Sequence, residues 1–282
     1  MSAIAIRIIT DSTCDLSRED QEKLGIQVIP LTVHFSGESY LDGIDLTNEQ
    51  FYDKLEKSEH LPTTSQVPPE RFINAFQAHL DAGDEVVGIF ISSEISGTYN
   101  SACVAKNTLA SDRLHIVDSR IAAMGLALLV SEATKHRDAG FTAEEIAGHV
   151  VTLSKKVRFF GAVNTLKYLR KGGRVSATTV VIGEALGMKP IVSMINGKVQ
   201  SIGKARGMQA ALRAILKDVL ADLPDLRYGV ALAHSCAPEL LDKAIACWKE
   251  PLGFTNWLVC NIGSVIGTYA GRGIVALAYI AK

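Results

Sequence analysis

The sequence contains no hydrophobic run long enough to cross a membrane, and it has few aromatic residues. Its richest apolar run, 121–130, is about half the length that a membrane-spanning helix needs and is followed by Ser131 and Glu132. Aromatic residues make up 6% of the chain, which disfavours a stacking surface for single-stranded nucleic acid. The 29 basic and 30 acidic residues give a net charge of -1, which disfavours polyanion binding in general. We therefore expect no membrane span and no nucleic-acid partner.

Signals for disulfides and for export are also missing. The cysteines are odd in number, widely spaced and without a CxxC motif, as expected for reduced thiols. The apolar segment 4–9 is too short for a signal peptide and turns polar at Thr10, so it predicts a buried strand. These features predict a cytoplasmic protein. The cysteines are Cys14, Cys103, Cys236, Cys247 and Cys260.

The common catalytic and cofactor motifs are absent. No GxSxG, HExxH or Walker pattern occurs, and the seven histidines lack metal-ligand spacing. The segment 271–276 matches G-x-G-x-x-A, but the sequence continues only to Lys282, which leaves no room for the helix and second strand of a dinucleotide site. We expect no metal, no cofactor and no catalytic residue.

Apolar residues, by contrast, are abundant. They make up 48% of the chain against 21% charged residues, which is enough to bury a core. Without a membrane span, this apolar excess predicts a large core, an interface, or a pocket for an apolar ligand.

The first half of the chain alternates strand and helix signals. Its strand candidates are apolar at nearly every position, as strands covered on both faces require. Helix-start signals lie between them, at Ser17, Thr47, Pro68-Pro69 and Thr142. The strand candidates are 4–9, 26–35, 86–91 and 114–117. The alternation predicts an N-terminal domain, residues 1–155, built as an α/β/α sandwich around a parallel sheet.

The second half has a different pattern. Runs 191–195 and 198–202 flank Asn196-Gly197, a pair typical of the type I′ turn, and predict a hairpin. Because hairpins form antiparallel pairs, we expect a C-terminal α/β domain, residues 156–282, with a mixed or antiparallel sheet. A short helix is predicted within 166–173. Further strand candidates are 157–163, 228–233, 257–259 and 273–280.

Three segments near the ends of predicted strands are rich in hydroxyl groups: 10–15, 62–66 and 92–101. In a parallel sheet, ligands bind beyond the carboxyl ends of the strands. Some of these hydroxyls cap helices, but each segment holds more of them than capping requires. Ser96-Gly97 precedes a predicted helix, whose free N–H groups suit a carboxylate or phosphate. The segments predict the holding of an anion rather than its cleavage.

Two loops are basic, 167–174 and 204–207. Capping of a helix C-terminus explains Lys171 and Gly172. It does not explain Arg174 or Arg206, which are therefore candidates for contact with a phosphate or an acidic partner.

Several motifs, in their order along the chain, resemble the DegV family. They are Thr10-Asp11-Ser12, Thr64-Ser65-Gln66, the SSEISGTYNSA segment 92–102, Asp118-Ser119, the KGGR segment 171–174, Lys189-Pro190-Ile191 and Ile262-Gly263 to Gly267. Each motif alone is weak, but the SGTYNSA and KGGR segments together are specific. The resemblance covers nearly the whole chain.

The resemblance implies a two-domain protein that holds a long-chain fatty acid, such as palmitate, between its domains. By this resemblance the carboxylate is held by Thr64 and Ser96, with Gly97 and Tyr269 beside them. Some members present the fatty acid to a separate ATP-dependent kinase subunit, which makes an acyl phosphate. Arg174 and a second basic position, Arg206, map onto arginines implicated in that encounter. Exchange of lipid implies transient contact with a membrane surface.

One departure from the family pattern affects this interpretation. The family carries His and Pro where this sequence has Tyr269 and Arg272. A tyrosine donates a hydrogen bond to a carboxylate but brings no positive charge near neutral pH. The change from His to Tyr269 is compatible with lipid binding, but it removes a positive charge that phosphotransfer would use. Arg272 is the candidate to supply that charge instead.

A lipid ligand agrees with the composition, because burying about 14 methylenes is worth roughly 11 kcal/mol before the costs of association. Two other hypotheses stay open. The first is an enzyme acting on a small phosphorylated or hydroxylated substrate, with Asp11, Ser12 and Ser96 around an anion and Arg174 or Arg206 on a phosphate. The second is a pure interaction module that uses the loop 167–174.

Overall fold

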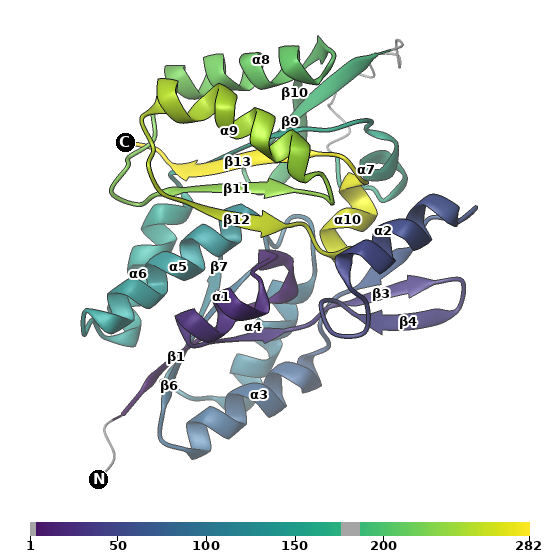
Figure 1. Cartoon of the computed structure of the whole chain (residues 1–282). Coiled ribbons are helices and arrows are strands. Elements are labelled where there is room, and N and C mark those ends of the chain that lie inside the picture. The colour runs from purple at the N-terminus through teal and green to yellow at the C-terminus, as the bar shows by residue number, and fades with distance from the viewer. Residues whose placement is uncertain (1–3, 176–186) are drawn as a thin grey trace.

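The computed structural model describes residues 4–175 and 187–282 as an α/β protein of two domains. The N-terminal domain contains a four-stranded parallel sheet of order β2-β1-β6-β7 (Figure 1). Its strands are β1 (Ile6–Asp11), β2 (Ile26–Ile29), β6 (Glu85–Phe90) and β7 (Leu114–Asp118). The predicted parallel sheet is confirmed.

Helices cover both faces of this sheet. One face packs against α3 and α4, whose phenylalanines and alanines meet Ile9, Val86 and Phe90. The other face packs against α5 and α6. The helices of this half are α1 (Arg18–Leu24), α2 (Asn48–Lys57), α3 (Pro69–Asp81), α4 (Thr98–Leu109), α5 (Met124–Asp138) and α6 (Ala143–Ser154), with a 3-10 turn η1 (Ser12–Cys14) after β1.

A small three-stranded sheet corrects the prediction of one long strand over 26–35. The chain leaves β2 at Ile29, and β3 (Thr32–Phe35) pairs instead with β4 (Glu38–Leu41) and β5 (Thr63–Ser65). Pro30 has no N–H to donate to a ladder, which separates the two strands. The hydroxyl-rich segment 62–66 is therefore partly a strand.

The C-terminal domain contains a six-stranded sheet of order β10-β9-β8-β13-β11-β12. Strands β11 and β12 pair in parallel and the other neighbouring strands of this sheet pair antiparallel, so the sheet is mixed, in agreement with the prediction. The strands are β8 (Val157–Ala162), β9 (Met188–Ile195), β10 (Lys198–Arg206), β11 (Val230–His234), β12 (Trp257–Asn261) and β13 (Val275–Ile280). The helices are α7 (Lys167–Lys171), α8 (Met208–Ala221), α9 (Pro238–Leu252) and α10 (Ser264–Ala270).

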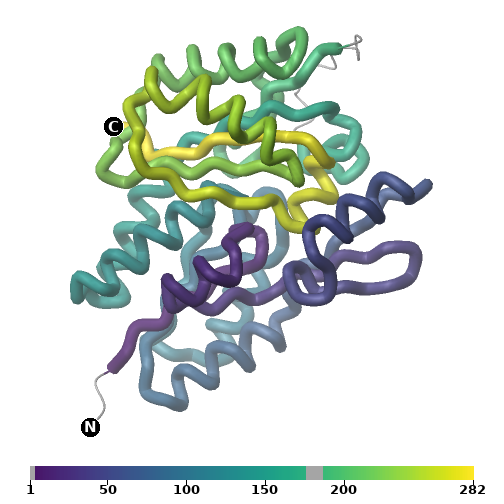
Figure 2. Tube along the Cα trace, in the orientation of Figure 1, coloured from purple at the N-terminus to yellow at the C-terminus, as the bar shows by residue number. Residues whose placement is uncertain are grey.

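Helix α5 lies between the two sheets. Figures 1 and 2 show α8 and α9 on the outer face of the C-terminal sheet and α5 beneath its inner face. Residues of α5 pack on β1 and β6 on one side and on Ala231, Ala276 and Ala278 on the other. Most of the apolar run 121–130 is therefore the start of α5, a helix buried between two sheets, which explains why it has no polar face. No helix of the described residues is long and apolar enough to span a membrane.

The tip of the β9–β10 hairpin docks on the N-terminal domain. Asn196 and Gly197 have φ angles of 52° and 80°, as the predicted type I′ turn requires. Ser92 Oγ donates to Gly197 O at 2.8 Å, and Arg120 Nη2 donates to Asn196 O at 2.6 Å. Lys198 also pairs with Glu94 at 3.2 Å. The turn is thus both a hairpin and an interdomain contact.

We predict that Gly197→Ala destabilises the protein by about 1 kcal/mol or more. A Cβ there would lie 2.5 Å from Ser92 Oγ, and φ is already in the left-handed region. Urea unfolding measures the change in the free energy of unfolding. The matched control is Gly203→Ala on the same hairpin, where a Cβ meets no atom within 4 Å. Equal effects of both variants would show that the docked turn carries no special constraint.

Candidate functional site

A cavity of about 370 Å³ lies between the two domains. Its walls come from the carboxyl ends of the N-terminal strands, the inner face of the C-terminal sheet and α10. Most of the lining side chains are apolar, and the volume is within the usual range for small-molecule pockets. Ala122 and Ala123, just before α5, line it, so the cavity continues the layer that α5 occupies.

Small residues create this space. Gly161 on β8 faces the cavity, and a Cβ there would lie 3.2 Å from Val192 Cγ2 and 3.6 Å from Ala276 Cβ. Ala122, Ala123 and Ala276 line the same region. A larger side chain at any of these positions would project into the cavity.

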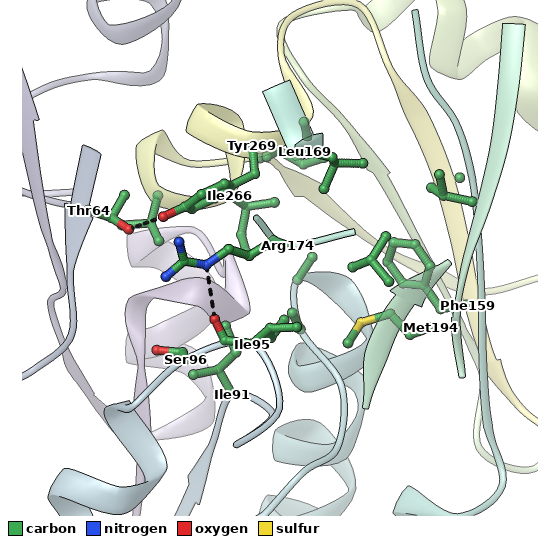
Figure 3. Close-up of a pocket in the computed structure, with 18 of the residues that line it drawn as sticks. Thr64, Ile91, Ile95, Ser96, Phe159, Leu169, Arg174, Met194, Ile266 and Tyr269 are labelled. Carbon is green, nitrogen blue, oxygen red and sulfur yellow. Dashed lines mark hydrogen bonds between the residues drawn. The ribbon is translucent and has the colours of Figure 1, made fainter. Parts of the chain in front are cut away.

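The two ends of the cavity differ in chemistry. Figure 3 shows Thr64, Ser96, Arg174 and Tyr269 around one end, here called the polar end. Phe159 and Met194 lie at the other end, here called the apolar end. The cavity therefore suits an elongated molecule with one polar terminus.

Thr64 and Tyr269 meet across the polar end. Thr64 lies on β5 and Tyr269 on α10, and their hydroxyl oxygens are 2.5 Å apart. Each hydroxyl keeps further hydrogen-bonding capacity after this contact. The two residues that the sequence placed at the site are thus brought together from 205 positions apart.

Ser96 and Gly97 form the turn that leads into α4. Ser96 Oγ accepts from Thr98 N at 3.2 Å and donates to Thr98 Oγ1 at 3.0 Å. Gly97, the N-cap residue, has no side chain to cap α4, and because Gly97 lines the cavity the N-terminus of α4 lies beside it. A Cβ on Gly97 would lie 1.9 Å from Gln66 Oε1, which explains the glycine. The predicted helix N-terminus is confirmed.

Arg174 places a positive charge at the polar end. Its guanidinium lies 4.9 Å from the centroid of the Tyr269 ring. Its Nε donates to Ile95 O at 3.3 Å and its Nη1 to Gly172 O at 2.6 Å (Figure 3). Gly172 in turn leaves room for the Tyr269 ring, since a Cβ there would lie 2.4 Å from it. The KGGR segment thus packs directly against Tyr269.

A second pocket, of about 440 Å³, adjoins the polar end from outside. Thr64, Arg174 and Tyr269 line both this outer pocket and the cavity. Among the residues that line only the outer pocket are Glu59, His60 and Lys171, and Lys171 with Arg174 outnumber the single acid. A polar group held at the cavity's polar end is therefore separated from a basic outer pocket only by these shared residues.

The other two arginines lie elsewhere. Arg206 is exposed at the end of β10 and does not line the cavity. Arg272 forms ion pairs with Asp53 at 3.3 Å and Glu56 at 3.1 Å, both on α2. The charge of Arg272 is therefore directed to α2 and not to the cavity.

The residues proposed for a small-molecule enzyme do not share a pocket. Asp11 is fully buried, its carboxylate accepts from Thr13 N at 3.0 Å and Ile91 N at 2.8 Å, and burial raises its pKa to about 6. Ser12 lines a separate pocket, whereas Ser96 lines the cavity. No group of three or more His, Cys, Asp or Glu in residues 4–175 and 187–282 is arranged to hold a metal ion.

Comparison with known proteins identifies the family. A family model described as "Uncharacterised protein, DegV family" matches residues 5–282. A DegV domain-containing protein of Clostridium perfringens is 38% identical over 277 residues, covering 98% of both chains. A DegV domain-containing protein of Caldanaerobacter subterraneus is 35% identical over 269 residues, covering 94% of this chain and 95% of the relative.

The chain belongs to the DegV family.

Solved DegV structures share its fold and bind fatty acids. A DegV family protein of Thermus thermophilus, described by its fatty acid binding, superposes with a TM-score of 0.87 at 29% identity over 98% of this chain and 100% of that chain. DegV of Bacillus subtilis, a fatty acid binding protein, gives 0.86 at 29% identity over 99% and 100%. A Eubacterium eligens DegV protein loaded with heptadecanoic acid gives 0.85 at 27% identity over 99% and 100%.

The apolar end of the DegV cavity was not found from the sequence. Phe159 lies on β8 and Met194 on β9, in runs that were predicted only as strands. An apolar residue that lines a cavity has the same pattern as one that packs in a core, so no signal in the sequence distinguishes them. The distinction becomes visible once the C-terminal sheet is assembled, because part of its inner face is then not covered by α5.

Proposed function

We propose that this protein binds a long-chain fatty acid in the interdomain cavity, with its carboxylate at Thr64 and Ser96. The observation that carries this proposal is the one-sided polarity of the cavity. An apolar space with hydroxyls, a helix N-terminus and an arginine at one end matches a molecule that is apolar except for a terminal anion.

The polar end supports the carboxylate by hydrogen bonds and by charge. Thr64 offers a hydroxyl, Ser96 can exchange its bond to Thr98 Oγ1 for one to the carboxylate, and the N-terminus of α4 adds the positive end of its dipole. Arg174 supplies the positive charge, because a tyrosine side chain such as that of Tyr269 carries none. These groups need only offset the cost of dehydrating one carboxylate. Affinity then comes from the chain, at roughly 0.8 kcal/mol for each methylene buried.

Presentation of the lipid to a separate ATP-dependent kinase is the second part of the proposal. The outer pocket supports it, because a carboxylate behind Thr64 and Tyr269 lies next to a basic space reached from outside. In this role the protein is a non-catalytic subunit. Arg206, exposed on the hairpin, is a proposed contact for the partner. The fatty-acid-binding DegV structures support the lipid ligand.

We predict that the purified protein carries a long-chain fatty acid, detected by solvent extraction and mass spectrometry. Thr64→Ala with Ser96→Ala should weaken rebinding at least tenfold, because each hydrogen bond to a charged group is worth about 1.5–3 kcal/mol. Isothermal titration with palmitate measures the affinity. The control is Thr108→Ala, which removes an exposed hydroxyl of α4 that bonds within the helix. Unchanged affinity in the folded double variant would overturn the assignment of the polar end.

We predict that Phe159→Ala shifts the preferred ligand toward longer acyl chains, since it removes the ring at the apolar end. Gly161→Val should instead weaken the binding of all long-chain fatty acids, because the larger side chain narrows the middle of the cavity. Competition among saturated acids of 12 to about 20 carbons, read by mass spectrometry, measures both effects. The control is Phe160→Ala on the same strand, which packs on the outer face with Tyr279. A shift in this control as large as in Phe159→Ala would contradict the prediction.

We predict that Arg206→Glu lowers acyl-phosphate formation by at least tenfold when a kinase subunit and ATP are added, and leaves palmitate affinity unchanged. The reason is that charge reversal at a contact adds repulsion to the loss of attraction. Arg213→Glu, on the exposed side of α8, is the control. Equal rates for Arg206→Glu, Arg213→Glu and the unaltered protein would exclude Arg206 from the contact.

A further inference from the structure

The N-terminal domain holds the start of α10 through two aspartates that accept hydrogen bonds from it. Asp42 Oδ1 accepts from Ser264 N at 2.9 Å and from Ser264 Oγ at 2.6 Å. Asp15 Oδ1 accepts from Gly263 N at 2.9 Å. Two further bonds hold the preceding residues: Asn48 Nδ2 donates to Asn261 O at 2.8 Å and Tyr52 Oη to Ile262 O at 3.1 Å.

The two carboxylates are buried and close together. Asp15 is 8% exposed and Asp42 is 4% exposed. A Cβ built on Gly263 would lie 3.0 Å from Asp15 Oδ1 and 3.2 Å from Asp42 Oδ1, so the aspartates flank one backbone position. Asp15 Oδ2 is buried with no hydrogen-bond partner among the described residues. Burying a carboxylate oxygen without a hydrogen-bond partner costs free energy, which points to a role for the bond that the other oxygen of Asp15 accepts from Gly263 N.

Helix α10 carries part of the cavity wall. Ile266, Tyr269 and Ala270 line the cavity within the seven residues of α10. Gly267 lies against α2, where a Cβ would be 2.6 Å from both Phe51 Cε1 and Tyr52 Oη. Because the helix is so short, the bonds at its first residue set where Tyr269 lies. The contact between Tyr269 and Thr64 depends on that position.

We propose that Asp15 and Asp42 are positioning residues for lipid retention: they latch the start of α10 to the N-terminal domain and so keep Tyr269 closed over the polar end of the cavity. This inference rests on the proposed fatty-acid binding. Neither aspartate lines the cavity. Release of the latch lets α10 swing away and opens the polar end for exchange of the lipid.

The charge of the aspartates makes the latch sensitive to pH. Burial raises the pKa of Asp15 well above its ordinary value, and the nearby carboxylates of Asp42 and Asp11 raise it further; burial also raises the pKa of Asp42. The titratable and charged groups near the pair are Asp11 on β1, Cys14 on η1, Tyr52 on α2 and Cys260 on β12, with Arg18 of α1 on the exposed side of the same pocket.

The sign of the pH effect follows from these shifts. The folded pKa of Asp15 lies above the unfolded value, so the folded protein keeps a proton that the unfolded chain releases. The protonated carboxyl of Asp15 contributes its full stabilisation of the folded protein at pH values below the pKa that Asp15 has in the unfolded chain. This contribution is lost as pH rises through the pKa that Asp15 has in the folded protein. Ionised Asp15 then repels Asp42, and the latch weakens as pH rises.

The test compares Asp42→Ala, Asp42→Asn and Asp15→Asn with the unaltered full chain. Hydrogen exchange of residues 261–270 reports the latch without any ligand, and release of a fluorescent fatty acid reports its effect on retention. Asp42→Ala should raise both the rate of hydrogen exchange in residues 261–270 and the rate of fatty-acid release by about tenfold or more, because it removes two hydrogen bonds. Asp42→Asn keeps an acceptor and should restore most of the retention. Asp15→Asn should abolish the rise in release rate with increasing pH.

The matched control is Asp84→Asn, a buried aspartate that bonds Ala5 N and Arg7 at the start of β6, away from α10. It should lower stability without changing exchange in 261–270. The proposed latch is contradicted if residues 261–270 of Asp42→Ala exchange as slowly as those of the unaltered protein. It is also contradicted if Asp84→Asn releases lipid as fast as Asp42→Ala does. Absence of fatty-acid binding in the unaltered protein, with the exchange result as expected, overturns the proposed function and leaves α10 latched for another ligand.

Discussion

The separation of the two sheets by α5 is the constraint on which the rest of the structure depends. A helix between sheets holds them about 10 Å or more apart, and its side chains fill that layer only along its own length. Before Met124 the layer continues without a helix, and small residues such as Gly161 and Ala276 do not fill it. The cavity is therefore a consequence of where α5 begins, and not of a missing core residue.

The polar end is assembled from segments that each have a structural reason of their own. Gly97 makes room for Gln66, Gly172 makes room for Tyr269, and Arg174 stacks on that ring while it donates to Ile95 O. These contacts place the hydroxyls of Thr64, Ser96 and Tyr269, a helix N-terminus and one cation around a single space. Tyr269 contributes a hydroxyl there without a charge, so the positive charge at this end comes from Arg174.

Much of the fold and of the polar end could be predicted from the sequence, for identifiable reasons. Apolar runs predicted the parallel strands, Asn196-Gly197 predicted the hairpin, and motifs predicted residues that the structure brings to one cavity. The strand β5 could not be predicted, because its polar residues pair with β3 far along the chain. The contact between Asp15 and Gly263 spans 248 positions and has no local signal.

The uncovered layer beside α5 ties the folded state to its occupant. An apolar space inside the protein leaves its walls without contact partners, whereas a chain of methylenes in it would complete the packing of both sheets. A ligand that binds only the folded form stabilises it according to its free concentration. With a lipid as that ligand, the lifetime of each molecule in the cell would follow the supply of acyl chains, and starvation for lipid would itself select molecules for degradation.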